Sequence, residues 1–164
     1  MKSKKLLIIP IIIVILILVF NFSGGGTARY IKEETGFDLK SRSIIKEEDS
    51  HGGFLGDGEY ILIADCSKKP AGEGELENWK KLPLTENLQT MIYSGIEPTE
   101  YEYSIAWDNG IPLIENGYYY FINRHTNAAG RDSDEDLFDV VSFNFSLALY
   151  DCDEDMFYYY ELDT

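Results

Sequence analysis

The stretch Asp139-Val-Val-Ser-Phe-Asn-Phe-Ser-Leu-Ala-Leu-Tyr150 decides the fold, because apolar and small or polar side chains alternate along it. Successive side chains of a β-strand point to opposite faces of the sheet. One face of this segment therefore collects the apolar residues Val141, Phe143, Phe145, Leu147 and Leu149, and the other collects Ser142, Asn144, Ser146 and Ala148. The alternation predicts a half-buried antiparallel strand.

Segments on either side of this strand predict its neighbours in the sheet. Met156 to Leu162 follows through the turn Asp151 to Asp155, which is typical of a hairpin. Ile111 to Asn123 reads as a further strand, with Gly117 as a kink or bulge. Earlier in the chain, Glu59 to Cys66 alternates in the same way, and Ser43 to Lys46 predicts a first strand.

Short helical patterns lie between the predicted strands. Ala28 to Glu34 reads as a short helix that Gly36 ends. Thr85 is placed to cap a second helix, in which Leu88, Met91 and Ile92 share one face. Leu76 and Trp79, three residues apart, predict an amphipathic turn. The predicted fold class is α+β: an N-terminal membrane helix followed by a twisted, largely antiparallel sheet with two or three short helices packed on one face.

The amino-terminal segment carries an export or anchoring signal. Three lysines within the first five residues precede an apolar run from Leu6 to Phe20, which Phe22 extends. Residues 1–22 are therefore predicted to be a membrane anchor, residues 23–27 a Gly-rich linker and residues 28–164 a single acidic extracytoplasmic domain. This predicts a single-pass membrane protein with a cytoplasmic amino terminus. A cleaved signal peptide and a secreted domain are the alternative.

The composition limits the partners of this domain. The chain has 164 residues, 14 Lys or Arg and 29 Asp or Glu, so its formal net charge is −15. All of the acids and 11 of the basic residues follow residue 26, which gives residues 27–164 a charge of −18. Binding a nucleic acid requires clustered Lys and Arg, which the domain lacks, so nucleic acid is excluded as a partner. The charge favours cations or a basic protein.

The segment His51-Gly-Gly-Phe-Leu-Gly-Asp-Gly58 is the first candidate site. Its glycines permit close approach of a ligand, and His51 with Asp57 would supply a base and an orienting carboxylate for a small hydrolase. A bulged turn between two strands is the alternative. Together with the aromatic run Tyr118 to Tyr120, the segment predicts a surface for a small ligand or a partner protein, made of His51, Gly52, Gly53, Phe54, Asp57 and Tyr119.

Two acidic clusters are candidates for a weak calcium site, since Ca²⁺ binds carboxylate oxygens on loops. The first contains Asp132, Asp134 and Asp136, and the second contains Asp151, Asp153 and Asp155. Neither cluster has the glycine and glutamate spacing of an EF-hand. Solvated turns, in which Asp side chains accept bonds from nearby backbone amides, are the alternative. The sequence predicts no other cofactor.

Cys66 and Cys152 lie at the ends of predicted strands in the domain that is expected outside the cell. A disulfide persists in that compartment, so these two residues are a possible bridge. Small buried core residues are the alternative.

Five segments of the chain carry a resemblance: His51 to Glu59, Trp79 to Leu84, Glu115 to Phe121, Ser142 to Phe145 and Met156 to Thr164. In these segments the chain resembles small membrane-anchored or secreted proteins of Gram-positive bacteria. The resemblance implies a cell-surface setting and carries no activity, substrate or catalytic residue with it. The leading hypothesis is a non-enzymatic, membrane-tethered binding or accessory module. The alternatives are the hydrolase, a calcium-responsive surface domain, and an immunity or inhibitor protein against a basic partner.

Overall fold

The computed structural model describes residues 26–52, 56–93, 105–125 and 130–164. The chain is α+β and divides into two compact units, residues 1–40 and 41–164. The predicted membrane anchor, residues 1–22, lies outside the described residues, as do Ser23, Gly24 and Gly25 of the predicted linker. Within the described part, none of the helices combines the length and the apolar character that a membrane span needs.

The first unit contains helix α2 (Gly26–Thr35). This helix begins two residues before the expected start at Ala28, so Gly26 and Thr27 belong to it and not to a linker. Gly36 has a φ of 81° and donates its amide to the carbonyl of Lys32, which ends the helix as predicted.

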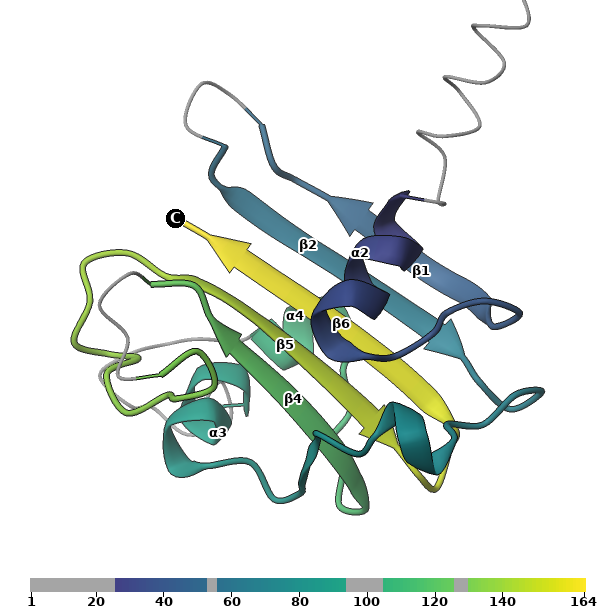
Figure 1. Cartoon of the computed structure of the whole chain (residues 1–164). Helices are drawn as coiled ribbons and strands as arrows, with labels where there is room; N and C mark the ends of the chain where they lie inside the picture. Colours follow the sequence, from purple (N-terminus) through teal and green to yellow (C-terminus); the bar gives the residue numbers. More distant parts are fainter. Residues whose placement is uncertain (1–25, 53–55, 94–104, 126–129) are drawn as a thin grey trace, which may run out of the picture. The chain divides into compact units, whose positions relative to one another are not determined.

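The second unit contains one six-stranded antiparallel sheet with the order β1-β2-β6-β5-β4-β3 (Figure 1). Hairpins join β1 to β2 and β5 to β6, and the pairing of β2 with β6 brings the two hairpins together in the middle of the sheet. The strands are β1 (Ser43–Asp49), β2 (Gly58–Asp65), β3 (Lys80–Lys81), β4 (Gly117–Asn123), β5 (Asn144–Asp151) and β6 (Met156–Asp163). The largely antiparallel sheet that the sequence predicts is thereby confirmed.

Strand β5 confirms the expected alternation but is shorter and more buried than predicted. Phe145, Leu147 and Leu149 all lie in the hydrophobic core. The strand begins at Asn144, which pairs with Asp163 at the end of β6, so the segment from Asp139 to Phe143 lies before the strand. The prediction of a half-buried strand was wrong, since β5 is buried on both faces.

Helices α3 (Glu86–Tyr93) and α4 (Ile105–Asn109) pack on one face of the sheet (Figure 1). Leu88, Met91 and Ile92 of α3 share a core with apolar side chains of β2, β4, β5 and β6. Thr85 caps α3 as predicted, because its hydroxyl accepts the amide of Leu88 at 3.4 Å. A short 3-10 helix, η2 (Glu73–Glu75), lies in the connection from β2 to β3.

Candidate functional site

The glycine-rich segment forms the connection of the β1–β2 hairpin, which agrees with the turn alternative. Ser50 donates its amide to the carbonyl of Glu59 at 2.8 Å and closes the hairpin. A Cβ atom at Gly58 would lie 2.5 Å from the Cα of His51, so the two sides of the connection approach too closely for a side chain there. Gly53 and Phe54 of the predicted surface lie outside the described residues.

The carboxylate that contacts His51 is that of Asp49 and not the predicted Asp57. The imidazole Nδ1 lies 2.8 Å from Asp49 Oδ1, which also accepts the backbone amide of His51 at 2.9 Å. These two hydrogen bonds lower the pKa of Asp49. The correction follows from local geometry, because an Asp readily bonds the backbone two residues later. Asp57 is exposed, and its backbone carbonyl accepts the amide of Gly52 at 3.4 Å. The expected base and its orienting carboxylate are therefore not assembled from these two residues.

The carboxylates of the first acidic cluster point to separate partners. Asp132 pairs with Lys80, Asp134 accepts the hydroxyl of Thr85, and Asp136 accepts the side-chain amide of Asn123 at 3.4 Å.

The second cluster is also arranged around separate contacts. Asp151 accepts the amides of Asp153 and Glu154, as an Asp in a turn does, while Asp155 accepts the hydroxyl of Tyr150 at 2.7 Å. Asp153 accepts the side-chain amide of Asn116 at 2.6 Å. In the part of the chain that the structure describes, no group of three or more His, Cys, Asp or Glu residues is arranged to hold a metal ion.

Cys66 and Cys152 are both free thiols. Cys66 donates its amide to the carbonyl of Asp155, beyond the end of β2, and Cys152 follows β5 directly. Strand β6 runs between β2 and β5, and a separation of two strands is about 10 Å. A disulfide requires Cα atoms less than about 7 Å apart, so a bridge would need the turn to move. The bridge stays a prediction.

The structure draws attention instead to the outer side of β4, which the two-residue strand β3 covers only in part. Backbone groups of successive residues in an antiparallel strand point to opposite sides. Arg124 donates its amide to Asn144, next to β5, whereas Asn123 donates in the other direction, to the carbonyl of Arg131 at 2.7 Å. Gly117 likewise accepts the amide of Leu82 on the outer side. By this alternation, the N–H and C=O groups of Phe121 point away from β5, toward the edge.

Among the described residues, the outer side of β4 is covered at both ends, and none of them pairs with its middle. Strand β3 pairs only with Tyr118 and Tyr119, and the loop at Arg131 covers Asn123. A longer β3 would place Asn78 opposite Phe121, but the chain turns before that, because Trp79 donates its amide to the carbonyl of Leu76 at 3.0 Å. The Trp79 ring then packs 6.0 Å from the ring of Tyr120. The gap at Phe121 follows from this turn.

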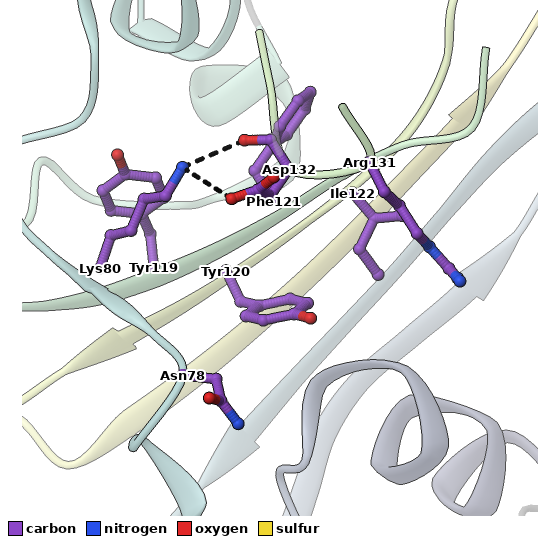
Figure 2. A pocket seen from close by; sticks show the side chains of 8 residues that line it. All are labelled: Asn78, Lys80, Tyr119, Tyr120, Phe121, Ile122, Arg131 and Asp132. Atoms are coloured by element: carbon purple, nitrogen blue, oxygen red, sulfur yellow. Dashed lines mark hydrogen bonds and ion pairs between the residues drawn. The ribbon is translucent and has the colours of Figure 1, made fainter. Parts of the chain in front are cut away.

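A cavity of about 380 Å³ occupies the gap (Figure 2). This volume is near the lower end of the range for ligand pockets, about 300 to 1,000 Å³. Figure 2 shows Lys80 and Tyr119 on one side of Tyr120, and Ile122 and Arg131 on the other. The lining residues are Asn78, Lys80, Tyr119, Tyr120, Phe121, Ile122, Arg131 and Asp132. The cavity is therefore bordered by aromatic rings, one main-chain donor and acceptor, and charged groups.

An ion pair spans the cavity from β3 to the loop. The Lys80 ammonium donates to the backbone carbonyl of Asp132 at 3.0 Å and lies 3.5 Å from its carboxylate. Both side chains are largely exposed, so this pair contributes little to stability and is easily opened. Tyr119 is buried beside it, and burial together with the Asp134 carboxylate raises the pKa of its hydroxyl.

Comparison with known proteins adds no assignment: no protein-family model, no curated protein and no solved structure matches the chain.

Of the residues that line the cavity, the sequence predicted Tyr119 as a ligand contact and Asp132 as a metal ligand. It missed Asn78, Lys80, Arg131 and the backbone of Phe121. Lys80 and Arg131 lie far apart in the sequence and share no motif, so only the pairing of β3 and the loop with β4 brings them together.

Proposed function

We propose that this protein is a non-enzymatic, membrane-tethered binding module that displays its domain outside the cell. Its ligand site is the cavity at the edge of β4, and its ligand is a short segment of extended peptide. The proposal is carried by the position of Phe121, which lines that cavity and whose N–H and C=O point outward by the alternation along β4.

A peptide that adds to a sheet edge gains its affinity from main-chain hydrogen bonds. Phe121 offers one donor and one acceptor, and an amide-bearing ligand satisfies both. The ladder is occupied at Tyr119 and at Asn123, four residues apart, which corresponds to about 13 Å along the strand. This opening admits one or two ligand residues and not a long strand. The rings of Tyr119 and Tyr120 supply contact area with few rotatable bonds.

The tether rests on the sequence of residues 1–22, a basic start followed by an apolar run. We expect the full-length chain to partition with the membrane fraction, and its domain to be digested when protease is added to intact cells whose wall has been removed. Recovery of the full-length chain in the soluble cytosolic fraction would overturn this part of the proposal.

The ligand site is tested with the full chain in detergent micelles and a pool of random pentapeptides that are capped at both ends. We expect the Phe121 amide to exchange its hydrogen faster than the Asn123 amide in the free protein, and to become protected when the pool is added. Two results contradict the proposal. One is that, in the free protein, the Phe121 amide is as protected from exchange as the Asn123 amide. The other is that the protection of the Phe121 amide does not change when the pool is added.

A pair of adjacent variants provides the control. Asn78→Tyr places a ring in the cavity and is expected to abolish protection of Phe121 by the pool. Glu77→Tyr makes a comparable change at an exposed residue that does not line the cavity, and it is expected to leave protection intact. Equal effects of the two variants would place the ligand elsewhere.

A further inference from the structure

The edge cavity has a basic neighbour. A second cavity of about 350 Å³ lies at the end of β4 and is lined by Asn123, Arg124, His125 and Arg131. Arg131 also lines the edge cavity. The gap at Phe121 therefore adjoins, on the side of Asn123, a space bordered by two arginines and a histidine.

This concentration of basic side chains is unusual in so acidic a chain, which has 29 acidic residues and 14 basic ones. Three basic side chains, those of Lys80, Arg124 and Arg131, line the two cavities. Asp132 is the one acidic residue that lines them. Arg124 is engaged elsewhere: its guanidinium lies 3.2 Å from the Glu161 carboxylate. Arg131 is exposed and is the residue common to both cavities.

The backbone of Arg131 is held in place, and its exposed side chain borders both cavities. Its carbonyl accepts the amide of Asn123 at 2.7 Å, and the Asn123 side chain donates to the carbonyl of Ser133 at 3.2 Å. Figure 2 shows the Arg131 side chain beside Ile122, away from the ion pair of Lys80 and Asp132. A guanidinium has five N–H donors in a planar fork, so it can bind a carboxylate with two of them and keep other partners.

We propose that the ligand of the edge cavity ends in a free carboxylate, which Arg131 binds. This inference rests on the proposed function and names the ligand class more narrowly: the carboxyl end of a short peptide. Phe121 and Asn123 are about 7 Å apart along the strand. One terminal residue bound at Phe121 covers about half of that distance toward Arg131, whose side chain borders both cavities.

The test compares two pools of random pentapeptides that differ only in a free carboxylate or a carboxamide at the end, with the full chain in detergent. Binding is followed by the NMR shift of the Phe121 amide. We expect the free-acid pool to bind about tenfold more tightly or better, because a hydrogen bond to a charged group contributes more than a neutral one. Arg131→Gln should remove this advantage, so that the free-acid and carboxamide pools bind the variant equally well. Arg29→Gln, a matched change at an exposed arginine of α2, should alter neither.

The outcomes separate the two claims. Equal binding of the two pools, with a clear shift of Phe121, overturns the carboxylate inference and leaves the binding module intact. An acid preference that Arg131→Gln does not reduce overturns the role of Arg131. Absence of any Phe121 shift with either pool overturns both the inference and the proposed function.

Discussion

The guanidinium of Arg42, the residue directly before β1, is completely buried. It links the start of β1 to the segment that joins β2 to β3. It donates to both carboxylate oxygens of Glu75 at 2.8 Å, and to the backbone carbonyls of Lys69 and Pro70. The Arg42 side chain is 0% exposed and that of Glu75 is 21% exposed. A bidentate pair of this kind is strong, but removal of one partner leaves the other charge buried without compensation, which lowers stability.

We therefore expect Arg42→Ala to lower the free energy of unfolding by about 3 kcal/mol, near the lower limit for breaking a buried pair, because Glu75 regains some water. Urea titration of the variant measures the change. Arg29→Ala is the control, since Arg29 and its partner Glu33 are largely exposed, and its stability should not differ from that of the parent protein. An equal loss in the two variants would mean that the buried pair is not the cause.

Burial raises the pKa of the Cys66 thiol from its ordinary value of 9.0 to about 11. Since the thiolate is the reactive form, we expect Cys66 to react with iodoacetamide at pH 8 about 100-fold more slowly in the native protein than after unfolding. The same shift contributes stability that is present below pH 9.0 and is lost as the pH rises toward about 11.

Mass spectrometry of the alkylated protein counts the thiols that have reacted, and it also tests the predicted bridge. Two reactive thiols after unfolding without reductant would exclude the Cys66–Cys152 bridge, and none would establish it.

At the scale of single elements, β4 begins at a glycine for a steric reason. A Cβ atom at Gly117 would lie 2.1 Å from the carbonyl oxygen of Tyr150, the residue before its partner Asp151 on β5. The register with β5 stays regular from this position onward, so the predicted bulge was wrong. The glycine is needed for close approach.

Gly117→Ala is expected to destabilise the protein by about 2 kcal/mol, as overpacking of a well-packed site does, and to separate the start of β4 from β5. Thermal unfolding measures the loss. Gly74→Ala is the control, since nothing lies within 4 Å of a Cβ atom there. A Gly117→Ala variant as stable as the control would show that the two strands part at little cost.

The two edges of the sheet are protected in different ways, and the difference supports the proposed site. Strand β1 carries Lys46, Glu47 and Glu48 and contains a bulge between Ile44 and Lys46, devices that discourage pairing with another strand. The β4 edge is instead covered by β3 and by the loop at residues 130–133. In the described part of the chain, the outward-facing position left between these two covers is that of Phe121.

Strands and caps were predictable because they depend on local patterns. The alternation of Phe145, Leu147 and Leu149, and the capping hydroxyl of Thr85, are both visible within a few residues of sequence. The ends of strands depend on their partners, which is why the start of β5 was placed too early. The site could not be predicted for two reasons. The partner of His51 depends on the geometry of a local turn. The edge cavity is formed by three segments that lie far apart in the sequence and share no motif.

At the scale of the whole molecule, the excess of acidic residues opposes compaction, because like charges repel over a protein surface. Residues 27–164 carry a formal charge of −18. The Debye length falls from about 30 Å at 0.01 M salt to about 8 Å at 0.15 M, so salt screens distant repulsion more than it weakens close ion pairs.

We therefore expect the melting temperature to rise by about 3 °C, equivalent to about 1 kcal/mol, between these two NaCl concentrations. Glu73→Gln with Glu77→Gln neutralises two exposed acids near η2. This double variant should melt higher than the parent at 0.01 M salt and gain less from added NaCl, whereas a general salting-out effect would act on both proteins equally. A melting temperature that falls with salt would mean that close pairs such as Lys32 with Asp38, 2.7 Å apart, outweigh the repulsion. In that case the excess of acidic residues would not be the dominant electrostatic contribution to stability.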